Sequence, residues 1–480
     1  MVMGELTQEC EVVVIGAGPG GYAAAFHAAD LGKEVTLVES DPRPGGVCLF
    51  RGCIPSKTLL FLTELLYDTR RSEGMGIRFG EPEINLDGIR AWKDQVIQRL
   101  AKGLMTLCKQ RGVQLLQARA GFEDSQRVRL NDCEISHMTF KHAILATGSR
   151  PILLPGAGEA AGRRVMDSTG ALALADIPAT LLVIGGGYVG LELGMVYASL
   201  GSRVTLVELG DRLLPGMDRD LVKPLAQRVG EAFAGVHLNT KVENLVEYDD
   251  RVEVTLTGSA DPPQQSFERV LVAIGRRPNT EDLGLEHTGV KLDPHGFLVV
   301  DEHQRTADPH IFAVGDVVGG FMLAHKAMRE GRVAAEVIAG KPSAFDVRAI
   351  PAVVYTDPQI ATCGLSEEQS QATQRPHKVA RFPWSASGRA MTMGTTEGLT
   401  KVIIEPGSER VLGVGIVGRG AGEMIAEGVL AVEMGASAED VALSIHPHPT
   451  LSETEEEAAE AFLGSPVHVY VPKTASGKKG

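Results

Sequence analysis

Two segments of the chain share one pattern of apolar and polar positions. Each begins with a short apolar run rich in β-branched residues, passes through a glycine-rich turn into a longer apolar stretch, and ends in a second short apolar run. The first segment extends from Glu11 to Glu39 and the second from Leu181 to Glu208. Short apolar runs bounded by turn residues predict buried strands, and the longer stretches predict helices. The repeat therefore predicts an α/β fold with two Rossmann-like dinucleotide-binding domains.

The glycines of the two turns correspond in order: Gly16, Gly18 and Gly21 in the first copy, and Gly185, Gly187 and Gly190 in the second. The first glycine of such a set makes the tight turn, the second admits a pyrophosphate to the backbone, and the third lets helix and strand pack closely. Free N–H groups at the helix N-terminus favour phosphate. Two bound dinucleotides are therefore expected, against the alternative of two glycine-rich turns without a ligand.

An acidic residue ends each unit, at Glu39 and at Glu208. A carboxylate in this place accepts hydrogen bonds from a ribose diol. It also repels a 2′-phosphate, so Glu208 favours NAD over NADP on the second unit. Arg203 and Arg212 are near enough in sequence to leave NADP open, because NADP sites use arginine for the 2′-phosphate.

The rest of the chain divides at further strand-and-turn patterns. Buried-strand patterns from His142 to Pro151 and from Val270 to Asn279 both end in a Gly/Pro turn. A strand over residues 311–316 ends in Gly-Asp, and beyond it strands alternate with helices without another glycine fingerprint. We expect a first dinucleotide-binding domain over residues 1–150, a second over 151–280, a central segment over 281–349 and a mixed α/β domain over 350–480.

Charge and composition narrow the class of protein. The 480 residues carry 47 basic and 61 acidic side chains, and this net charge of −14 disfavours nucleic acid and anionic membranes as partners. Residues 1–10 lack the basic start of a secretory signal, so none is expected. The uncharged stretch from Val12 to Ala29 is about as long as a membrane span, but its central glycines favour strand, turn and helix instead. No transmembrane segment is expected.

Cys48 and Cys53 directly follow the first unit and are five positions apart. The intervening residues can bend so that the two sulfurs meet beside a bound redox cofactor. Iron–sulfur ligation would need another cysteine soon after Cys53, and zinc would need further Cys or His nearby. A redox-active pair is therefore favoured over a metal site or a structural cross-link, and no metal is expected. The other cysteines are expected to be buried free thiols in a reducing, cytosolic compartment: Cys10, Cys108, Cys133 and Cys363.

The run from Gly45 to Lys57 resembles the active-site stretch of the flavin-dependent pyridine nucleotide–disulfide oxidoreductases, and within them the branch that oxidises dihydrolipoyl groups. Val47 and Phe50 depart from the Thr and Asn usual there, which puts local packing on the flavin in question and leaves the sulfur chemistry intact. The resemblance covers nearly the whole chain. It implies FAD on the first unit beside a Cys48–Cys53 disulfide, NAD on the second, and a homodimer held by a dimerisation domain over residues 350–480.

The resemblance also assigns residues to the two cofactors. For FAD it implies Gly16, Gly18, Gly21, Glu39, Lys57, Thr147, Gly148, Asp316, Met322, Leu323, Ala324 and His325. For NAD it implies Gly185, Gly187, Tyr188, Val189, Gly190, Glu192, Glu208, Val242 and Gly275. From the residues alone, a helix cap is the alternative for Asp316, and His325 fits a structural residue at a helix start.

By resemblance, Lys57 and Glu192 form an ion pair beside the flavin, with Lys57 one helical turn past Cys53 on the same face. The alternative places both side chains on solvated helix faces, where charged residues usually lie. Tyr188, within the second fingerprint, is expected to cover the flavin until nicotinamide binds.

A proton-handling cluster is expected at His448 and Glu453, within the motif that begins at His446. A histidine can take a proton from a thiol near neutral pH, and a carboxylate on its other nitrogen fixes the tautomer. The alternative is structural, with Thr450 and Glu453 forming a capping box. The resemblance favours His448 as the base that serves the dithiol of the other subunit, Glu453 as its orienter and His446 as a structural residue.

The resemblance therefore implies oxidation of protein-bound dihydrolipoyl groups by NAD, with a lipoylated carrier of the 2-oxoacid dehydrogenase or glycine cleavage type as partner. The alternative within the family is another FAD- and NAD(P)H-dependent disulfide reductase. Mercuric reductases would carry a later cysteine pair, but no cysteine follows Cys363. A role as a docking subunit also stays open, through the acidic run from Glu453 to Glu457 and the tail to Gly480, although such runs are more often solvated helix faces.

Overall fold

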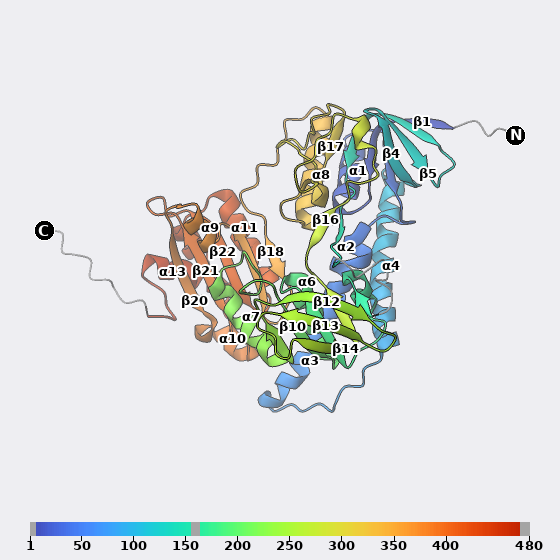
Figure 1. The fold of residues 1–480 in the computed structure, drawn as a ribbon. Coiled ribbons are helices and arrows are strands. Elements are labelled where there is room, and N and C mark those ends of the chain that lie inside the picture. The colour runs from blue at the N-terminus through green and yellow to red at the C-terminus, as the bar shows by residue number, and fades with distance from the viewer. Residues whose placement is uncertain (1–5, 155–163, 471–480) are drawn as a thin grey trace.

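The computed structural model describes residues 6–154 and 164–470 (Figure 1). A seven-stranded sheet with strand order β3-β2-β1-β6-β5-β4, and with β17 beside β6, forms the first layer. Its strands are β1 (Thr7–Ile15), β2 (Val35–Glu39), β3 (Gln114–Gln117), β4 (Arg119–Asp124), β5 (Arg127–Asn131), β6 (His137–Leu145) and β17 (Ile311–Ala313). β1 is parallel to both β2 and β6, so their carboxyl ends meet at one edge, where open α/β sheets bind ligands.

Helix α1 (Pro19–Asp30) follows the first glycine turn and packs on α8 (Ala324–Ile338). In any helix the N–H of the first residue has no intrahelical acceptor, so proline, which lacks an N–H, loses no hydrogen bond at the first position of α1. A Cβ at Gly331 would overlap the Gly20 carbonyl, so α1 and α8 cross with their backbones in contact. The segment expected as a central part of the chain thus returns to the first sheet through β17 and α8. The domain boundaries stay a prediction.

A second parallel sheet has strand order β11-β10-β9-β15-β8 and carries the second glycine turn. Its strands are β8 (Val165–Met166), β9 (Thr180–Ile184), β10 (Arg203–Val207), β11 (Gly235–His237) and β15 (Arg269–Val272). Helix α6 (Tyr188–Leu200) connects β9 to β10 and is buried along most of its length. An antiparallel sheet of β12 (Lys241–Glu247), β13 (Val252–Thr257) and β14 (Gln264–Phe267) lies between β11 and β15 in sequence.

The last part of the chain forms a five-stranded antiparallel sheet with order β18-β19-β22-β21-β20. Its strands are β18 (Ala352–Val354), β19 (Gln359–Gly364), β20 (Lys378–Pro383), β21 (Leu399–Ile404) and β22 (Val411–Gly418). Helices α11 (Ala421–Met434) and α13 (Glu453–Leu463) pack on this sheet. The expected α/β fold class, with two Rossmann-like units and a separate C-terminal α/β domain, is confirmed.

Long helices join these layers. They are α3 (Cys53–Arg71), α4 (Leu86–Gln110) and α7 (Arg219–Ala232). The chain also forms the short helices α2 (Gly46–Arg51), α5 (Ser168–Ala173), α9 (Glu367–Ala372), α10 (Gly388–Met393) and α12 (Ala438–Ala442). β7 (Ser149–Pro151) and β16 (Arg276–Pro278) pair as a two-stranded ribbon. Through this ribbon the chain passes between the first and second sheets in both directions.

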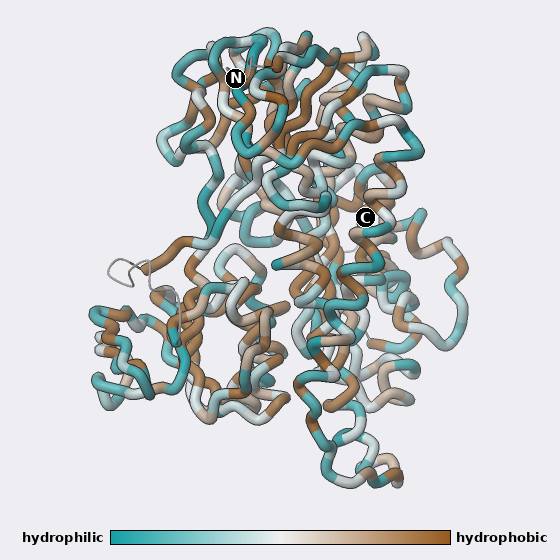
Figure 2. The backbone as a smooth tube through the Cα atoms, turned by 90° about the vertical axis from the view of Figure 1, so that its right-hand side faces the viewer, coloured by the Kyte–Doolittle hydropathy of each residue, from teal (hydrophilic) through white to brown (hydrophobic). Residues whose placement is uncertain are grey.

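Hydrophobic positions follow the inner strands and buried helix faces, and hydrophilic positions gather on turns and loops (Figure 2). In the described ranges, no helix combines the length and apolar character needed to cross a membrane. Cys10, Cys108 and Cys363 are buried free thiols, as expected. Cys133 is only half-buried, because it lies in the turn between β5 and β6, so the expectation of a buried thiol is wrong there.

Candidate active site

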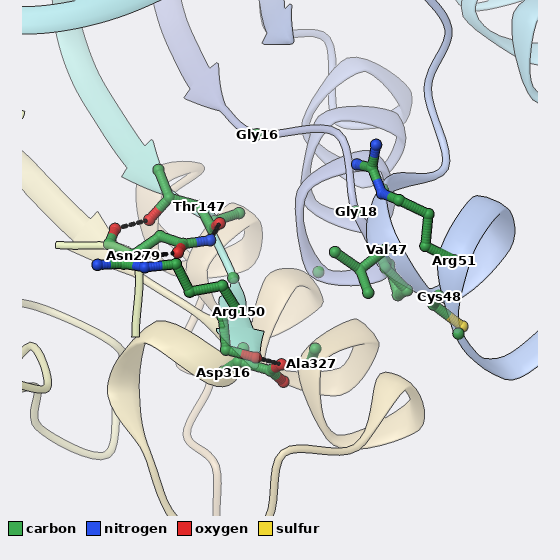
Figure 3. A pocket seen from close by; sticks show the side chains of 18 of the residues that line it. Gly16, Gly18, Val47, Cys48, Arg51, Thr147, Arg150, Asn279, Asp316 and Ala327 are labelled. Carbon is green, nitrogen blue, oxygen red and sulfur yellow. Dashed lines mark hydrogen bonds between the residues drawn. The ribbon is translucent and has the colours of Figure 1, made fainter. Parts of the chain in front are cut away.

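A cavity of about 860 Å³ opens at the carboxyl edge of the first sheet (Figure 3). Its wall is built from the first glycine turn, from α2 and α3, from residues after β6, and from the start of α6. In Figure 3 the turn at Gly16 and Gly18 lies on one side with Val47, Cys48 and Arg51, and Thr147 and Asp316 lie on the other. The cavity therefore brings together segments that are far apart in sequence.

Cys48 and Cys53 form a disulfide at this cavity, with 4.7 Å between their Cα atoms. Cys48 lies within α2 and Cys53 is the first residue of α3. Gly52 separates the two helices, and a side chain there would press on the Val47 carbonyl. The glycine thus lets the chain bend sharply enough for two sulfurs on adjacent helices to bond. The predicted disulfide is present and faces the space a dinucleotide could fill.

The first glycine turn fits a pyrophosphate. Gly16 has φ of 97°, and a Cβ on it would overlap the Ala146 carbonyl. A Cβ on Gly21 would overlap the carbonyl of Gly16. Gly18 has nothing within 4 Å of its Cβ position and lines the cavity. Two glycines therefore close the turn against the sheet, while the middle one leaves open space at the start of α1, where N–H groups point at an anion.

Glu39 lies at the other end of the same wall. One carboxylate oxygen accepts the N–H of Ala17 at 2.8 Å, and the other accepts the N–H of Asp41 at 3.1 Å. These bonds hold the carboxylate at the tip of β2, where it lines the cavity. A ribose diol entering here would meet an acceptor that is already oriented. The FAD assignment of these residues itself stays a prediction.

Lys57 and Glu192 meet across the cavity wall at 2.9 Å. Glu192 is 3% exposed and also accepts the Ser56 hydroxyl at 3.0 Å and the Tyr355 N–H at 2.9 Å. The Lys57 ammonium lies 4.5 Å from the centre of the Tyr355 ring. The alternative of two solvated helix faces is wrong for this pair, because the helices that carry them, α3 and α6, pack together.

On the opposite wall, Thr147 and Asn279 exchange hydrogen bonds of 2.7 and 2.9 Å between side chain and backbone (Figure 3). Asp316 accepts the Ser149 hydroxyl, and that hydroxyl oxygen in turn accepts a bond of 2.7 Å from Arg276. Asp316 lies in a 3-10 turn after β17, so its carboxylate does not cap a longer helix. Gly148 lies between these contacts and lines the cavity.

Only part of segment 322–325, which the resemblance assigns to FAD, lines the cavity. Met322 and Ala324 line the cavity, whereas Leu323 and His325 do not. His325 is the second residue of α8, and its ring bonds the Pro351 carbonyl at 2.7 Å. The structure thus gives His325 a contact that ties the start of α8 to the last domain. Its role toward FAD stays a prediction.

The second glycine turn repeats the geometry of the first. A Cβ on Gly185 would overlap the Ala273 carbonyl, and one on Gly190 would overlap the Gly185 carbonyl. Gly187, like Gly18, has nothing within 4 Å of its Cβ position. Glu208 accepts the N–H of Gly186 at 2.6 Å and that of Gly210 at 2.7 Å. The second unit therefore has the same two features as the first, a glycine turn that fits a pyrophosphate and an oriented carboxylate that fits a ribose, and both suit a second dinucleotide.

The remaining residues assigned to NAD lie in two groups. Tyr188 and Val189, at the start of α6, line the large cavity together with Glu192. Val242, on β12, packs against the apolar cluster that includes Ile184 and Val207. Gly275 has φ of 129° just after β15, and its Cβ position is 3.4 Å from Ile152. The turns at Gly185 and Gly275 thus flank the carboxyl end of the second sheet.

His448 and Glu453 form the expected pair, with Nδ1 of the ring 2.7 Å from a carboxylate oxygen. The other oxygen accepts the Thr450 N–H at 2.6 Å. Burial raises the pKa of Glu453, but the bonds from Thr450 and His448 outweigh it and hold that pKa below its usual value. The Glu453 N–H in turn donates to the Thr450 hydroxyl at 3.4 Å, so the reciprocal bonds of the expected capping box are present. Regular helix α13 begins only at Glu453, after Ser452.

The structure does not bring His448 to the disulfide within one chain. Its side chain is 69% exposed, and neither His448 nor Glu453 lines the cavity. In Figure 1, α13 lies on the far side of the molecule from α2. His446, in contrast, is buried between Glu427 at 2.8 Å and Glu456 at 3.3 Å. These carboxylates and the Ser444 carbonyl outweigh burial and raise the pKa of His446, which fits its expected structural role.

The acidic run from Glu453 to Glu457 is not a solvated helix face. Glu455 is 2% exposed and Glu457 is 6% exposed, because α13 packs its first turns on the C-terminal sheet. Burial and the Glu427 carboxylate raise the pKa of Glu455 to about 9. The tail beyond Tyr470, also considered for docking, lies outside the described residues.

Sequence reasoning missed several residues that line the cavity. Arg51 lies on α2 and binds Asp41 at 2.6 Å, and Arg119 and Asn131 approach from β4 and β5. Arg276 is the first residue of β16, and Asn279 directly follows that strand. Only Arg51, inside the dithiol motif, carried a local signal. The others reach the cavity through strand pairing, which a single sequence does not reveal.

A disulfide beside two dinucleotide-binding turns defines a thiol–disulfide oxidoreductase. The sequence profile described as pyridine nucleotide-disulphide oxidoreductase matches residues 10–331. The profile of that family's dimerisation domain matches residues 350–459. The chain belongs to the pyridine nucleotide-disulphide oxidoreductase family, is an oxidoreductase that uses FAD and NAD, and pairs as a homodimer.

Curated relatives match over nearly their full length. Dihydrolipoyl dehydrogenase of Vibrio cholerae is 44% identical over 459 residues, covering 95% of this chain and 96% of the relative. Dihydrolipoyl dehydrogenase of Geobacillus stearothermophilus is 44% identical over 470 residues, covering 98% and 99%. The chain is thus similar to these enzymes from one end to the other.

Solved structures show the same architecture. LpdA from Mycobacterium tuberculosis superposes with a TM-score of 0.85 at 28% identity, covering 94% of this chain and 99% of the other. The HOCl-induced flavoprotein disulfide reductase RclA from Escherichia coli superposes with a TM-score of 0.83 at 26% identity, covering 94% and 99%. The resemblance stated from the dithiol motif is therefore confirmed at the level of the family.

Proposed function

We propose that the chain is a dihydrolipoyl dehydrogenase, which oxidises protein-bound dihydrolipoyl groups and reduces NAD. The observation that carries this proposal is the Cys48–Cys53 disulfide at a cavity that also contains the first glycine turn and the start of α6. One substrate dithiol and one dinucleotide can therefore meet the same short segment of chain. The similarity to dihydrolipoyl dehydrogenases over nearly the whole sequence supports the choice of substrate.

The chain's own residues account for the thiol chemistry. His448 takes a proton from one dihydrolipoyl thiol, and the resulting thiolate attacks the Cys48 sulfur. The Cys48–Cys53 bond breaks, and Cys53 leaves as a thiolate. The second substrate thiol then attacks the mixed disulfide at the lipoyl sulfur and passes its proton to the departing Cys48 sulfur, which frees the oxidised lipoyl group and leaves Cys48 as a thiol. Glu453 holds the imidazole in the orientation that this proton transfer requires.

FAD is proposed to lie along the first glycine turn, with Glu39 at its ribose, Asp316 at its ribityl chain and Lys57 at its reactive end. Bound FAD would supply a two-electron carrier between the Cys48–Cys53 dithiol and NAD, with NAD as the hydride acceptor. NAD is proposed on the second turn, with Glu208 as the ribose acceptor and Tyr188 beside the shared cavity. The fixed positive charge of Lys57 favours an electron-rich neighbour, and Glu192 holds that charge in place.

The proton acceptor is proposed to come from the second subunit. His448 is far from the cavity of its own chain and largely exposed, and the family profile assigns its segment to dimerisation. A second copy that covers this segment would place His448 at the other chain's disulfide. The electron donor is then a lipoylated carrier protein. The free thiols outside the disulfide support a reducing, cytoplasmic compartment.

The test is turnover of the holoenzyme with dihydrolipoamide and NAD, followed as NADH formation. C53S is expected to lose this activity while retaining FAD, because the dithiol relay lacks its second sulfur. C133S is the matched control, since Cys133 is a free, half-buried thiol outside the cavity. NADH formation by C53S at the native rate would refute the relay. Preference for another disulfide substrate, or for NADPH, would favour a different reductase of the same family.

A further inference from the structure

One of the side chains that join the second dinucleotide unit to the C-terminal domain lies close in sequence to the ribose acceptor Glu208. Arg212 lies four positions after Glu208, and its guanidinium donates two hydrogen bonds to the carboxylate of Glu368, at 2.5 and 2.8 Å. Glu368 belongs to α9, within the region that matches the dimerisation profile. Two parallel bonds of this kind fix both position and orientation of a guanidinium.

The segment that carries Arg212 folds back over the second glycine turn. The Leu214 N–H donates to the Gly186 carbonyl at 3.0 Å, and the Leu213 side chain would be 2.8 Å from a Cβ on Gly186. Gly186 also donates to Glu208. The backbone next to Arg212 therefore lies against the second glycine turn, where the adenine ribose is expected. A flexible arginine side chain at this position would reach that ribose.

Glu368 is held in place independently of Arg212. The N–H groups of Glu367 and Glu368 both donate to the Asp218 carboxylate at 3.0 Å. Lys401, fully buried, binds the same carboxylate at 2.6 Å and Asp220 at 2.7 Å. The start of α9 is thus anchored to the chain just before α7. The backbone that carries Glu368 is therefore fixed beside the guanidinium of Arg212.

The other nearby arginines do not offer a free guanidinium to the ribose. Arg203 is the first residue of β10, and Glu208 follows its last residue, so about 16 Å of strand separates them. Arg219 lies 3.5 Å from Asp211 on an exposed part of the surface. Arg212 is therefore the cation whose release would change the charge next to Glu208.

We propose that Glu368 is a specificity-determining positioning residue, which selects NAD over NADP by holding Arg212 away from the 2′ position of the adenosine. The proposal rests on the assignment of NAD to the second unit. It adds that the discrimination is shared between that unit and the C-terminal domain. Glu208 repels a 2′-phosphate directly, and Glu368 withholds the arginine that could attract one.

The experiment measures binding of adenosine 2′,5′-bisphosphate and of 5′-AMP to the holoenzyme by titration calorimetry. E368Q is expected to bind the bisphosphate at least about tenfold more tightly than the unsubstituted enzyme, as one freed charged hydrogen bond allows. Its affinity for 5′-AMP should be unchanged. E368D, which keeps a carboxylate, should restore most of the discrimination.

The double variant R212Q/E368Q is the matched control. It should bind the bisphosphate as weakly as the unsubstituted enzyme, because no guanidinium is left to release. The proposal is wrong if E368Q gains no affinity for the bisphosphate, or if the gain persists in the double variant. Failure of 5′-AMP to bind the unsubstituted enzyme would instead overturn the assignment of NAD to the second unit, and this proposal with it.

Discussion

The Lys57 ammonium lies 2.9 Å from a carboxylate oxygen of Glu192, joining the helix that begins at Cys53 to the helix that follows the second glycine turn. Glu192 is buried and accepts further bonds from Ser56 and from the Tyr355 backbone. One carboxylate therefore connects the dithiol helix, the second dinucleotide unit and the C-terminal domain. This contact sets the relative position of the groups that must exchange electrons.

Two substitutions of Glu192 should separate the contribution of its charge to stability from the contribution of its hydrogen bonds. E192Q keeps a carbonyl oxygen for the Tyr355 N–H and an amide that can donate to the Ser56 hydroxyl, but it loses the ion pair, whereas E192A leaves Tyr355 and Ser56 without a partner. We expect E192A to destabilise the holoenzyme by about 1–3 kcal/mol and E192Q by less, because unmet buried donors cost more than a half-exposed ion pair. The midpoints of thermal unfolding should follow this order. Equal midpoints for the two variants would show that the charge, and not the bonds, holds α3 and α6 together.

Loss of His448 should slow turnover without unfolding the protein. H448Q is expected to lower kcat with dihydrolipoamide by about 10²- to 10⁴-fold, the range for removal of an acid–base catalyst. Its largely exposed side chain makes a similar unfolding midpoint the expected control result. H287Q, on an exposed 3-10 turn, serves as the matched histidine variant and should retain the native rate. A native rate for H448Q would remove His448 from the mechanism.

Lys401 should be among the most sensitive charges in the chain. Its ammonium is fully buried and lies within 3.3 Å of carboxylate oxygens of Asp218, Asp220 and Glu367. K401M leaves these carboxylates without their cation, and breaking a buried pair from one side costs about 3–5 kcal/mol. We expect a large fall in the unfolding midpoint, measured by calorimetry, against little change for the exposed control K102M. A midpoint within the range of K102M would contradict this account.

Glu455 should make stability depend on pH. Burial and Glu427 raise its pKa in the folded protein to about 9, whereas the unfolded chain titrates near 4.3, roughly the free value. A raised carboxyl pKa gives stability that is complete below the unfolded value and is lost as pH rises toward the folded value. E455Q removes this loss, so its stability relative to the native protein should grow from pH 5 to pH 9. Urea unfolding at several pH values measures the difference.

The exposed residue Glu81 provides the control for that series. E81Q should track the native protein at every pH, because Glu81 is exposed in the folded chain. A constant difference between E455Q and the native protein across pH 5–9 would mean that Glu455 is ionised in the folded chain. Its unpartnered, buried oxygen would then require a cation that neighbouring groups do not supply.

The sequence predicts those features whose cause is local. The turns at Gly16 and Gly185 follow from backbone overlap, which excludes any other residue and leaves a readable signature. The Cys48–Cys53 bond follows from their spacing. Residues brought in by distant pairing, such as Asn279 and Arg276, leave no such mark. Glu455 shows the opposite failure, since a run of glutamates looks solvated until the packing of α13 is known.

Coenzyme choice illustrates the same limit. Arg212 close to Glu208 left NADP open from the sequence, because a nearby arginine can bind a 2′-phosphate. Its partner Glu368 is more than one hundred and fifty positions away and belongs to another part of the fold. No local pattern connects the two residues. Only the docking of α9 on the second unit reveals that this guanidinium is already paired.

The most direct test of the central claim is to trap the dithiol after anaerobic addition of dihydrolipoamide to the holoenzyme. The account predicts that alkylation followed by peptide mass spectrometry labels Cys48 and Cys53 only after dihydrolipoamide is added. Adding NAD before alkylation should restore the disulfide and yield NADH. If the two cysteines stay unlabelled, or if NADH forms while the disulfide remains intact, the Cys48–Cys53 pair does not carry the electrons and the proposed function is wrong.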